Sequence, residues 1–248
     1  MSTSSPLNAA LTLVAGAARV FGSTARGLLL DSLAAGATLA ERAGAALTGR
    51  TRALATLPVR VVILSDEKGK PLLRPEAVAG ALQRADRVFA DGAGVRVRVV
   101  GVHTVKEPAP TEVLDPRANR ALLWDDIMGR TAFLRRSVPP RPVLSVSGDP
   151  VTVVVVRTIR GNVTGCSLGT RADWVICQAS LFDTRNERAY DETVLAHELG
   201  HALNLPHHRD TANLMHSTSS PPKKMRGTDL ARWQAAVIVG NRHVIPPA

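Results

Sequence analysis

The segment HELGHALNLPH occupies residues 197–207 and carries the strongest information in the sequence. Its first five residues fit the pattern H-E-x-x-H, in which two histidines stand four positions apart. Residues four apart lie on one face of a helix, so His197 and His201 can reach the same metal ion. Glu198 projects at another angle, where it can take a proton from a metal-bound water without binding the ion.

A third ligand requires the chain to turn back after His201. If the helix continued, residue 207 would lie about 9 Å further along its axis, at 1.5 Å per residue. Asn204 tolerates the left-handed conformation that ends helices, and Pro206 cannot continue a helix. We therefore expect His207 to complete a three-histidine site. Neutral imidazole nitrogen is a preferred ligand of zinc, so Zn²⁺ is the expected cofactor.

This extended motif resembles that of the metzincin zinc metallopeptidases, whose pattern is H-E-x-x-H-x-x-G-x-x-H followed by a methionine turn. Every metal-ligand position is matched, and Asn204 is the departure, because the family usually has Gly there. Met215 lies eight residues after His207, a gap like that of the matrixin branch. The resemblance implies that Met215 forms an apolar floor beneath the metal, and it covers residues 59–240.

The resemblance implies a zinc-dependent endopeptidase. In such an enzyme zinc polarises the scissile carbonyl and lowers the pKa of its bound water towards roughly 7. Glu198 would be the general base that removes the water proton and later delivers it to the leaving amine. The substrate would be a peptide or protein lying antiparallel along an edge strand, for which residues 173–178 are the candidate.

Two other functions remain open from the residues alone. The first is a non-catalytic zinc-binding module, against which the retention of Glu198 argues, since a structural site has no use for that base. The second is a basic protein that binds polyanions or an anionic surface. The net charge of +10 favours acidic partners, but the basic residues are scattered and aromatics make up only 3% of the chain, so we expect no specific nucleic-acid partner.

Residues 58–248 are predicted to form the peptidase domain, with an α/β (α+β) fold. We expect a mixed twisted sheet, an active-site helix and a small C-terminal lobe. Predicted strands cover 59–64, 95–100, 152–157 and 173–178, predicted helices cover 75–91, 119–136, 191–204 and 226–240, and irregular stretches cover 104–118 and 139–150.

Residues 1–57 are predicted to be a separate Ala/Gly-rich helical extension, which could be a pro-segment, a leader or a packing element. A conventional secretory signal begins with positively charged residues, but Met1–Pro6 contains no Lys or Arg. No uninterrupted apolar run reaches the roughly 18 residues of a membrane span, so we expect no transmembrane segment. The expected location is outside the cell or at its surface, with the cytoplasm as the alternative.

Several other side chains have two interpretations. Cys166 and Cys177 could form a disulfide across a hairpin or be two buried free thiols. His208 adjoins His207 but does not fit the ligand spacing. His216 could stabilise a transition state or lie exposed in a turn, and Asp210 could orient a ligand histidine or cap a turn.

Overall fold

Runs of β-branched residues build a five-stranded mixed sheet. The strands are β1 (Ala55–Ser65), β2 (Val95–Pro108), β3 (Val151–Val156), β4 (Gly165–Ser167) and β5 (Trp174–Gln178). Their order is β2-β1-β3-β5-β4, and every neighbouring pair is parallel except β4 with β5. All six residues of β3 are buried, as expected for a parallel strand covered on both faces.

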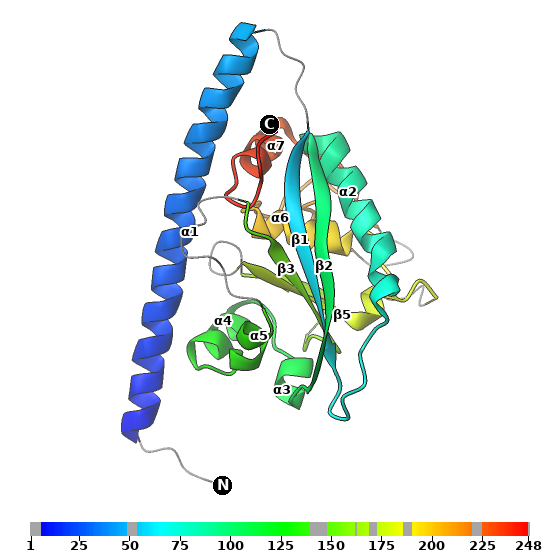
Figure 1. Cartoon of the computed structure of the whole chain (residues 1–248). Helices are drawn as coiled ribbons and strands as arrows, with labels where there is room; N and C mark the ends of the chain where they lie inside the picture. Colours follow the sequence, from blue (N-terminus) through cyan, green and yellow to red (C-terminus); the bar gives the residue numbers. More distant parts are fainter. Residues whose placement is uncertain are drawn as a thin grey trace.

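Helices cover both faces of the sheet in this computed structural model (Figure 1). One apolar cluster joins the sheet to α2 (Ala79–Ala93), α6 (Val194–Ala202) and α7 (Arg232–Val239). A second cluster joins the other face to α3 (Thr111–Leu114), α4 (Asn119–Ile127) and α5 (Ala132–Ser137). Short 3₁₀ helices, η1 (Pro75–Val78) and η3 (Ala179–Phe182), precede α2 and follow β5. The structure describes residues 6–48, 54–138, 148–161, 163–168, 173–185, 190–219 and 225–247.

The predicted α/β class is confirmed, and the differences lie at element boundaries. β2 continues to Pro108, because it stays paired with β1 through the stretch predicted to be a loop. The predicted helix over 119–136 is two helices, separated by a turn in which Gly129 has φ 76°. The final helix starts only at Arg232, and the predicted irregular stretch 139–150 lies outside the described residues except for 148–150.

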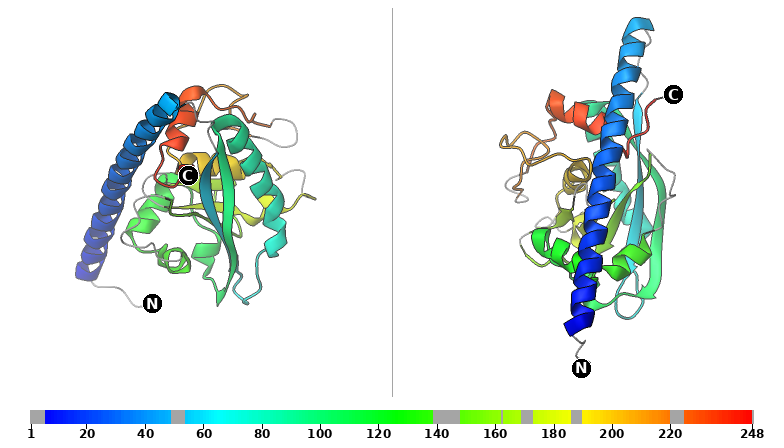
Figure 2. Two further views of the ribbon diagram at one scale, coloured as in Figure 1. Left: turned by 45° about the horizontal axis from the view of Figure 1, so that its top comes forward. Right: turned by 90° about the vertical axis from the view of Figure 1, so that its left-hand side faces the viewer.

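Helix α1 (Pro6–Thr48) runs along one side of the domain as a single 43-residue helix (Figures 1 and 2). Gly16, Gly27 and Thr38 are its buried positions; they stand eleven residues apart, which is close to three full turns. It packs against α4 and α7, and Asp31 also contacts Asn204 and Arg242. Residues 10–40 are long and apolar enough to cross a membrane by length and composition, whereas the sequence had led us to expect no such segment.

The two cysteines are free and buried, so no disulfide joins them. In the β4–β5 ladder Cys166 is paired with Ile176, one position away from Cys177. A shift of one residue places a side chain on the other face of a sheet, and the two thiols accordingly belong to different apolar clusters.

Candidate metal centre

Helix α6 presents the motif residues to a cleft while its apolar side packs on the sheet. The chain entering the helix is fixed by Asp191, whose carboxylate accepts a hydrogen bond from the backbone N–H of Thr193 at 2.8 Å. Leu195 and Leu199 join the core cluster shared with α2. His197 and Glu198 are also largely buried, with 3% and 6% of their surface exposed, so water has little access to either side chain.

The three predicted ligands converge. The ligand nitrogens of His197, His201 and His207 lie within 4.8 Å of one another, and the Nε2 atoms of His201 and His207 are 3.1 Å apart. Tetrahedral bonds of roughly 2.0–2.1 Å would place ligand nitrogens about 3.3 Å apart. The three rings are therefore close enough to share one metal ion of zinc's size, with the His201–His207 pair already near that spacing.

Backbone carbonyls set the orientation of two of these rings. The Nδ1–H of His197 donates to the Leu214 carbonyl at 2.8 Å, and that of His201 donates to the Leu205 carbonyl at 2.8 Å. A proton on Nδ1 leaves the Nε2 lone pair free for a metal. Burial, together with positive neighbours, lowers the pKa of His197 to about 2 and that of His201 to about 4, so both rings are neutral at pH 7.

Asn204 forms the turn that was expected after the motif helix. Its φ is 69°, in the left-handed region, and the Leu205 N–H donates to the Gly200 carbonyl at 2.9 Å. This reversal brings the Leu205 carbonyl beneath His201 and carries the chain back to His207. The side chain of Asn204 contacts a residue far away in the sequence, Asp31.

Met215 packs against the motif helix at Gly200 and is fully buried. Its carbonyl accepts the His208 N–H at 2.8 Å, and its own N–H donates to Asn213 Oδ1 at 2.9 Å. A Cβ atom at Gly200 would lie 2.5 Å from the Met215 sulfur, a distance that real Cβ atoms do not show. The glycine inside the motif is therefore required by the methionine packed against it.

This contact gives a prediction for stability. Gly200→Ala should lower the free energy of unfolding by about 1–3 kcal/mol, because the added methyl group overpacks the floor of the site. Gly80→Ala is the matched control: Gly80 is also helical, has open space around its Cβ position and should gain about 0.5–1 kcal/mol. Urea unfolding measures the free energy of unfolding of both variants. Equal behaviour of the two variants would contradict the close packing of Met215 on Gly200.

Glu198 lies beside the triad as an isolated buried carboxylate. Within the described residues it has no hydrogen-bond or ion-pair partner. Burial raises its pKa to about 8, while the positive charge of Arg226 acts to lower it. A Cβ at Gly165 would lie 2.7 Å from its Oε1, so the carboxylate is pressed against strand β4.

The edge strand beside the site is β4. The prediction that residues 173–178 form this edge is wrong, because β5 lies between β3 and β4. The parallel pairing of β3 with β5 uses one side of β5, and the antiparallel pairing with β4 uses the other. Only three residues form β4, which is too short to stand out as a strand in the sequence.

Arg226 is the site residue that sequence reasoning missed. It is 91% buried and lines the same cavity as the histidines. Its guanidinium donates to the His216 carbonyl at 3.2 Å, and its Nε lies 3.6 Å from Asp191 Oδ2. No spacing rule links a lone arginine eleven residues after Met215 to this site. Its positive charge disfavours protonation of the ligand histidines.

The triad opens into a cavity of about 850 Å³, which is within the range of ligand-binding sites. Its walls come from the β4 region, the start of α4, the α6 helix and the loop after Met215. The residues that line the cavity include Gly165, His197, Glu198, His201, Asn204, His207 and Arg226. The metal centre thus lies on the wall of a cleft that a substrate could enter.

The neighbouring residues with two interpretations make local hydrogen bonds in the turns that follow the motif helix. His208 stands outside the triad, and its ring nitrogen Nδ1 accepts the Asp210 N–H at 3.2 Å. Asp210 caps the turn by accepting the Ala212 N–H at 2.9 Å. His216 is half-buried, and its Nδ1 lies 3.0 Å from the Thr218 carbonyl.

No protein-family model matches this sequence, and no curated protein matches it either. Among solved structures, the chain is similar to metalloproteinase-II from Bacteroides fragilis (14% identity, TM-score 0.46), covering 77% of this chain and 54% of that one. It is also similar to archaemetzincin from Methanopyrus kandleri (16% identity, TM-score 0.47), covering 74% of this chain and 93% of that one. The chain therefore spans about half the length of the Bacteroides protein, and TM-scores below 0.5 assign it to no family.

Proposed function

We propose that this chain is a zinc-dependent endopeptidase of the metzincin type, with His197, His201 and His207 as metal ligands and Glu198 as general base. The observation that carries the proposal is the Glu198 carboxyl group, which has no hydrogen-bond partner among the described residues and is buried next to three imidazoles on the wall of a cleft. A purely structural zinc site uses four protein ligands and needs no adjacent base. Here the described residues bring three ligands together, and all three line the cavity.

The chemistry divides between the metal and the protein. When bound, zinc supplies Lewis acidity to a carbonyl oxygen and to a water molecule. Glu198 accepts the proton of the attacking water on its carboxylate and returns it to the leaving amine nitrogen, which balances the reaction. The burial of Glu198 excludes bulk water, and the carbonyls of Leu214 and Leu205 hold two ligand rings in place throughout.

Strand β4 is the proposed docking edge for the peptide. It pairs with β5 on one side, and as the last strand in the order it leaves its other side without a strand partner in the described sheet. An extended substrate can add to such an edge through main-chain hydrogen bonds, while a pocket selects one side chain. Gly165 then brings the substrate close to the Glu198 carboxylate, because it has no side chain to separate them.

Gly165→Ala tests this arrangement. The added methyl group would displace the Glu198 carboxylate, and misplacing a catalytic group by about 1 Å can cost about 100-fold in rate. We expect kcat for a cleaved peptide to fall by about that factor while zinc affinity stays within about twofold. An unchanged kcat would show that β4 does not approach the base.

The function itself is tested by cleavage of a mixed peptide library, read by mass spectrometry. Zinc-loaded protein should cut internal bonds, chelated protein should not, and added zinc should restore the same cuts. If zinc-loaded protein binds one metal per chain and cuts nothing, the alternative of a non-catalytic zinc-binding module takes precedence. Binding to heparin that weakens with salt, without any cleavage, would instead support the polyanion-binding alternative.

A further inference from the structure

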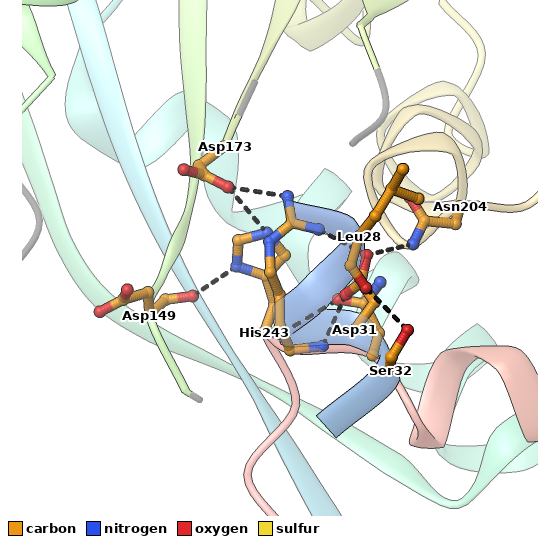
Figure 3. A network of polar contacts seen from close by, with 9 residues as sticks. Leu28, Asp31, Ser32, Asp149, Asp173, Asn204 and His243 are labelled. Atoms are coloured by element: carbon orange, nitrogen blue, oxygen red, sulfur yellow. Dashed lines mark hydrogen bonds and ion pairs between the residues drawn. The ribbon is translucent and has the colours of Figure 1, made fainter. Parts of the chain in front are cut away.

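Helix α1 reaches the metal centre through one carboxylate. Asp31 accepts a hydrogen bond from Asn204 Nδ2 at 2.8 Å, across 173 positions of sequence (Figure 3). The same carboxylate accepts the backbone N–H of Arg242 at 3.0 Å and its guanidinium at 2.7 Å. Asn204 is the left-handed residue of the turn between His201 and His207, so α1 holds the turn on which the third ligand depends.

The anchor of Asp31 is itself fixed to the sheet. Arg242 is only 2% exposed, and its guanidinium also donates to Asp173 at 2.9 Å, directly before β5. Next to it, His243 is fully buried, and its ring nitrogens lie 2.7 Å from the Asp149 carbonyl and 3.3 Å from the Asp173 carboxylate. Figure 3 shows this network joining α1, the turn after α6, the C-terminal segment and the strand region.

We propose that Asp31 is a positioning residue for the metal centre. Its carboxylate holds the Asn204 side chain, and thereby the left-handed turn that places the Leu205 carbonyl against His201 and returns the chain to His207. Glycine adopts this conformation without help, whereas asparagine has a Cβ to accommodate there. The Asp31 contact compensates for the absence of glycine. The inference rests on the proposed metal site and not on catalysis.

The test measures metal affinity in the full chain, by competition with a chelator, together with the visible spectrum of the Co²⁺ form. Asp31→Ala should weaken zinc binding about 10- to 100-fold, as loss of a residue supporting a metal ligand does. The Co²⁺ bands, which report ligand geometry, should shift. Asp31→Asn keeps the shape of the side chain and one acceptor oxygen, so it should weaken zinc binding less than Asp31→Ala does.

Two comparisons separate positioning from general loosening of α1. Arg19 joins the same helix to α4 through Asp126 at 2.8 Å, away from the metal centre, so Arg19→Gln should change zinc affinity by less than about twofold. In an Asn204→Gly background the turn no longer needs support from a side chain at residue 204. Asp31→Ala should then weaken zinc binding by less than about threefold. Equal losses for Arg19→Gln and Asp31→Ala, or an undiminished loss in the Asn204→Gly background, would overturn the proposal. All these readouts are independent of peptide cleavage.

The outer face of α1 carries a second, independent feature. Its large apolar side chains that are more than half exposed occupy an arc of about 140° at 3.6 residues per turn, on the side opposite the buried positions, whereas Leu13, which is 38% exposed, lies outside this arc. They are Leu11, Val14, Phe21, Leu28, Leu29, Leu33 and Leu39, each more than half exposed. Arg19, Arg26 and Asp31 all lie outside this arc. The uncharged face over residues 11–40 is about 45 Å long, at 1.5 Å per residue.

We infer that this face docks on an anionic lipid bilayer, with α1 lying along the surface. The two helices that contact α1 each expose a tryptophan, Trp124 at 48% and Trp233 at 46%, and tryptophan favours the membrane–water interface. The net charge of +10 attracts anionic headgroups and opposes close approach of a second copy. The contacts of Arg19 and Asp31 with the domain favour a helix lying on the membrane over one spanning it.

Co-sedimentation of the full chain with vesicles tests this inference. Binding should be at least tenfold tighter to vesicles containing phosphatidylglycerol than to pure phosphatidylcholine, and it should weaken with salt. A Leu29→Gln, Leu33→Gln double variant should lose at least about tenfold in affinity. Leu54→Gln, at an exposed leucine outside α1, should lose less than about twofold. The inference would be overturned if the chain sedimented with neither kind of vesicle. It would also be overturned if the chain formed concentration-dependent dimers and its vesicle binding did not change in the Leu29→Gln, Leu33→Gln variant.

Discussion

Glu198→Gln should lower kcat by about 10²- to 10⁴-fold, the range associated with loss of a general acid–base group, while one zinc ion per chain is retained. Glutamine keeps the shape of the side chain in its buried site but cannot take up a proton. Zinc content should be unaffected, because the ligand atoms are imidazole nitrogens. Kinetics on one cleaved peptide, at matched metal content, measure the effect.

Glu192→Gln is the control for that substitution. Glu192 lies six residues earlier, is 41% exposed and makes a surface ion pair with Arg84 at 3.4 Å. Surface pairs of this kind contribute little, so we expect activity within about twofold of the unaltered chain. A Glu198→Gln protein that keeps at least half of its activity would mean that another group serves as the base.

His207→Ala should weaken zinc binding by more than about 100-fold, because removing a ligand costs more than removing a residue that merely supports one. The neighbouring substitution His208→Ala should change affinity by less than about threefold, since that ring stands outside the triad. The two residues are adjacent in the chain, with His207 exposed and His208 half-buried, so urea unfolding of both variants controls for effects on folding. Competition with a chromophoric chelator gives both affinities.

If His208→Ala causes the larger loss, the chain reverses one residue later than the structure places it. The His201–His207 nitrogen separation of 3.1 Å would then misrepresent the bound state. Equal and small losses would mean that His197 and His201 hold the metal with a ligand from elsewhere.

The sequence predicted the centre of this site more completely than its periphery. The H-E-x-x-H spacing follows from helical geometry, and the need for a reversal before His207 follows from the rise of a helix. Asn204 was accordingly predicted to be left-handed, and its φ of 69° agrees. These are local relations, in which residues close in sequence determine one another's positions.

Long-range relations could not be read in the same way. The short edge strand at Gly165 is defined by pairing with β5, not by its own composition. Arg226 enters the site through tertiary packing alone, and the Asp31–Asn204 contact joins residues 173 positions apart. Composition alone left three roles open for residues 1–57, and α1 packs against α4 and α7.

The proposed function depends most on the claim that three histidines bind zinc and leave a fourth position open to the cleft. Zinc K-edge X-ray absorption on the zinc-loaded full chain tests this claim directly. We predict three imidazole nitrogens and one further oxygen at roughly 2.0–2.1 Å, with no sulfur. A sulfur scatterer near 2.3 Å, which would point to Cys166 or Cys177, or a fourth protein nitrogen closing the site, would contradict the account.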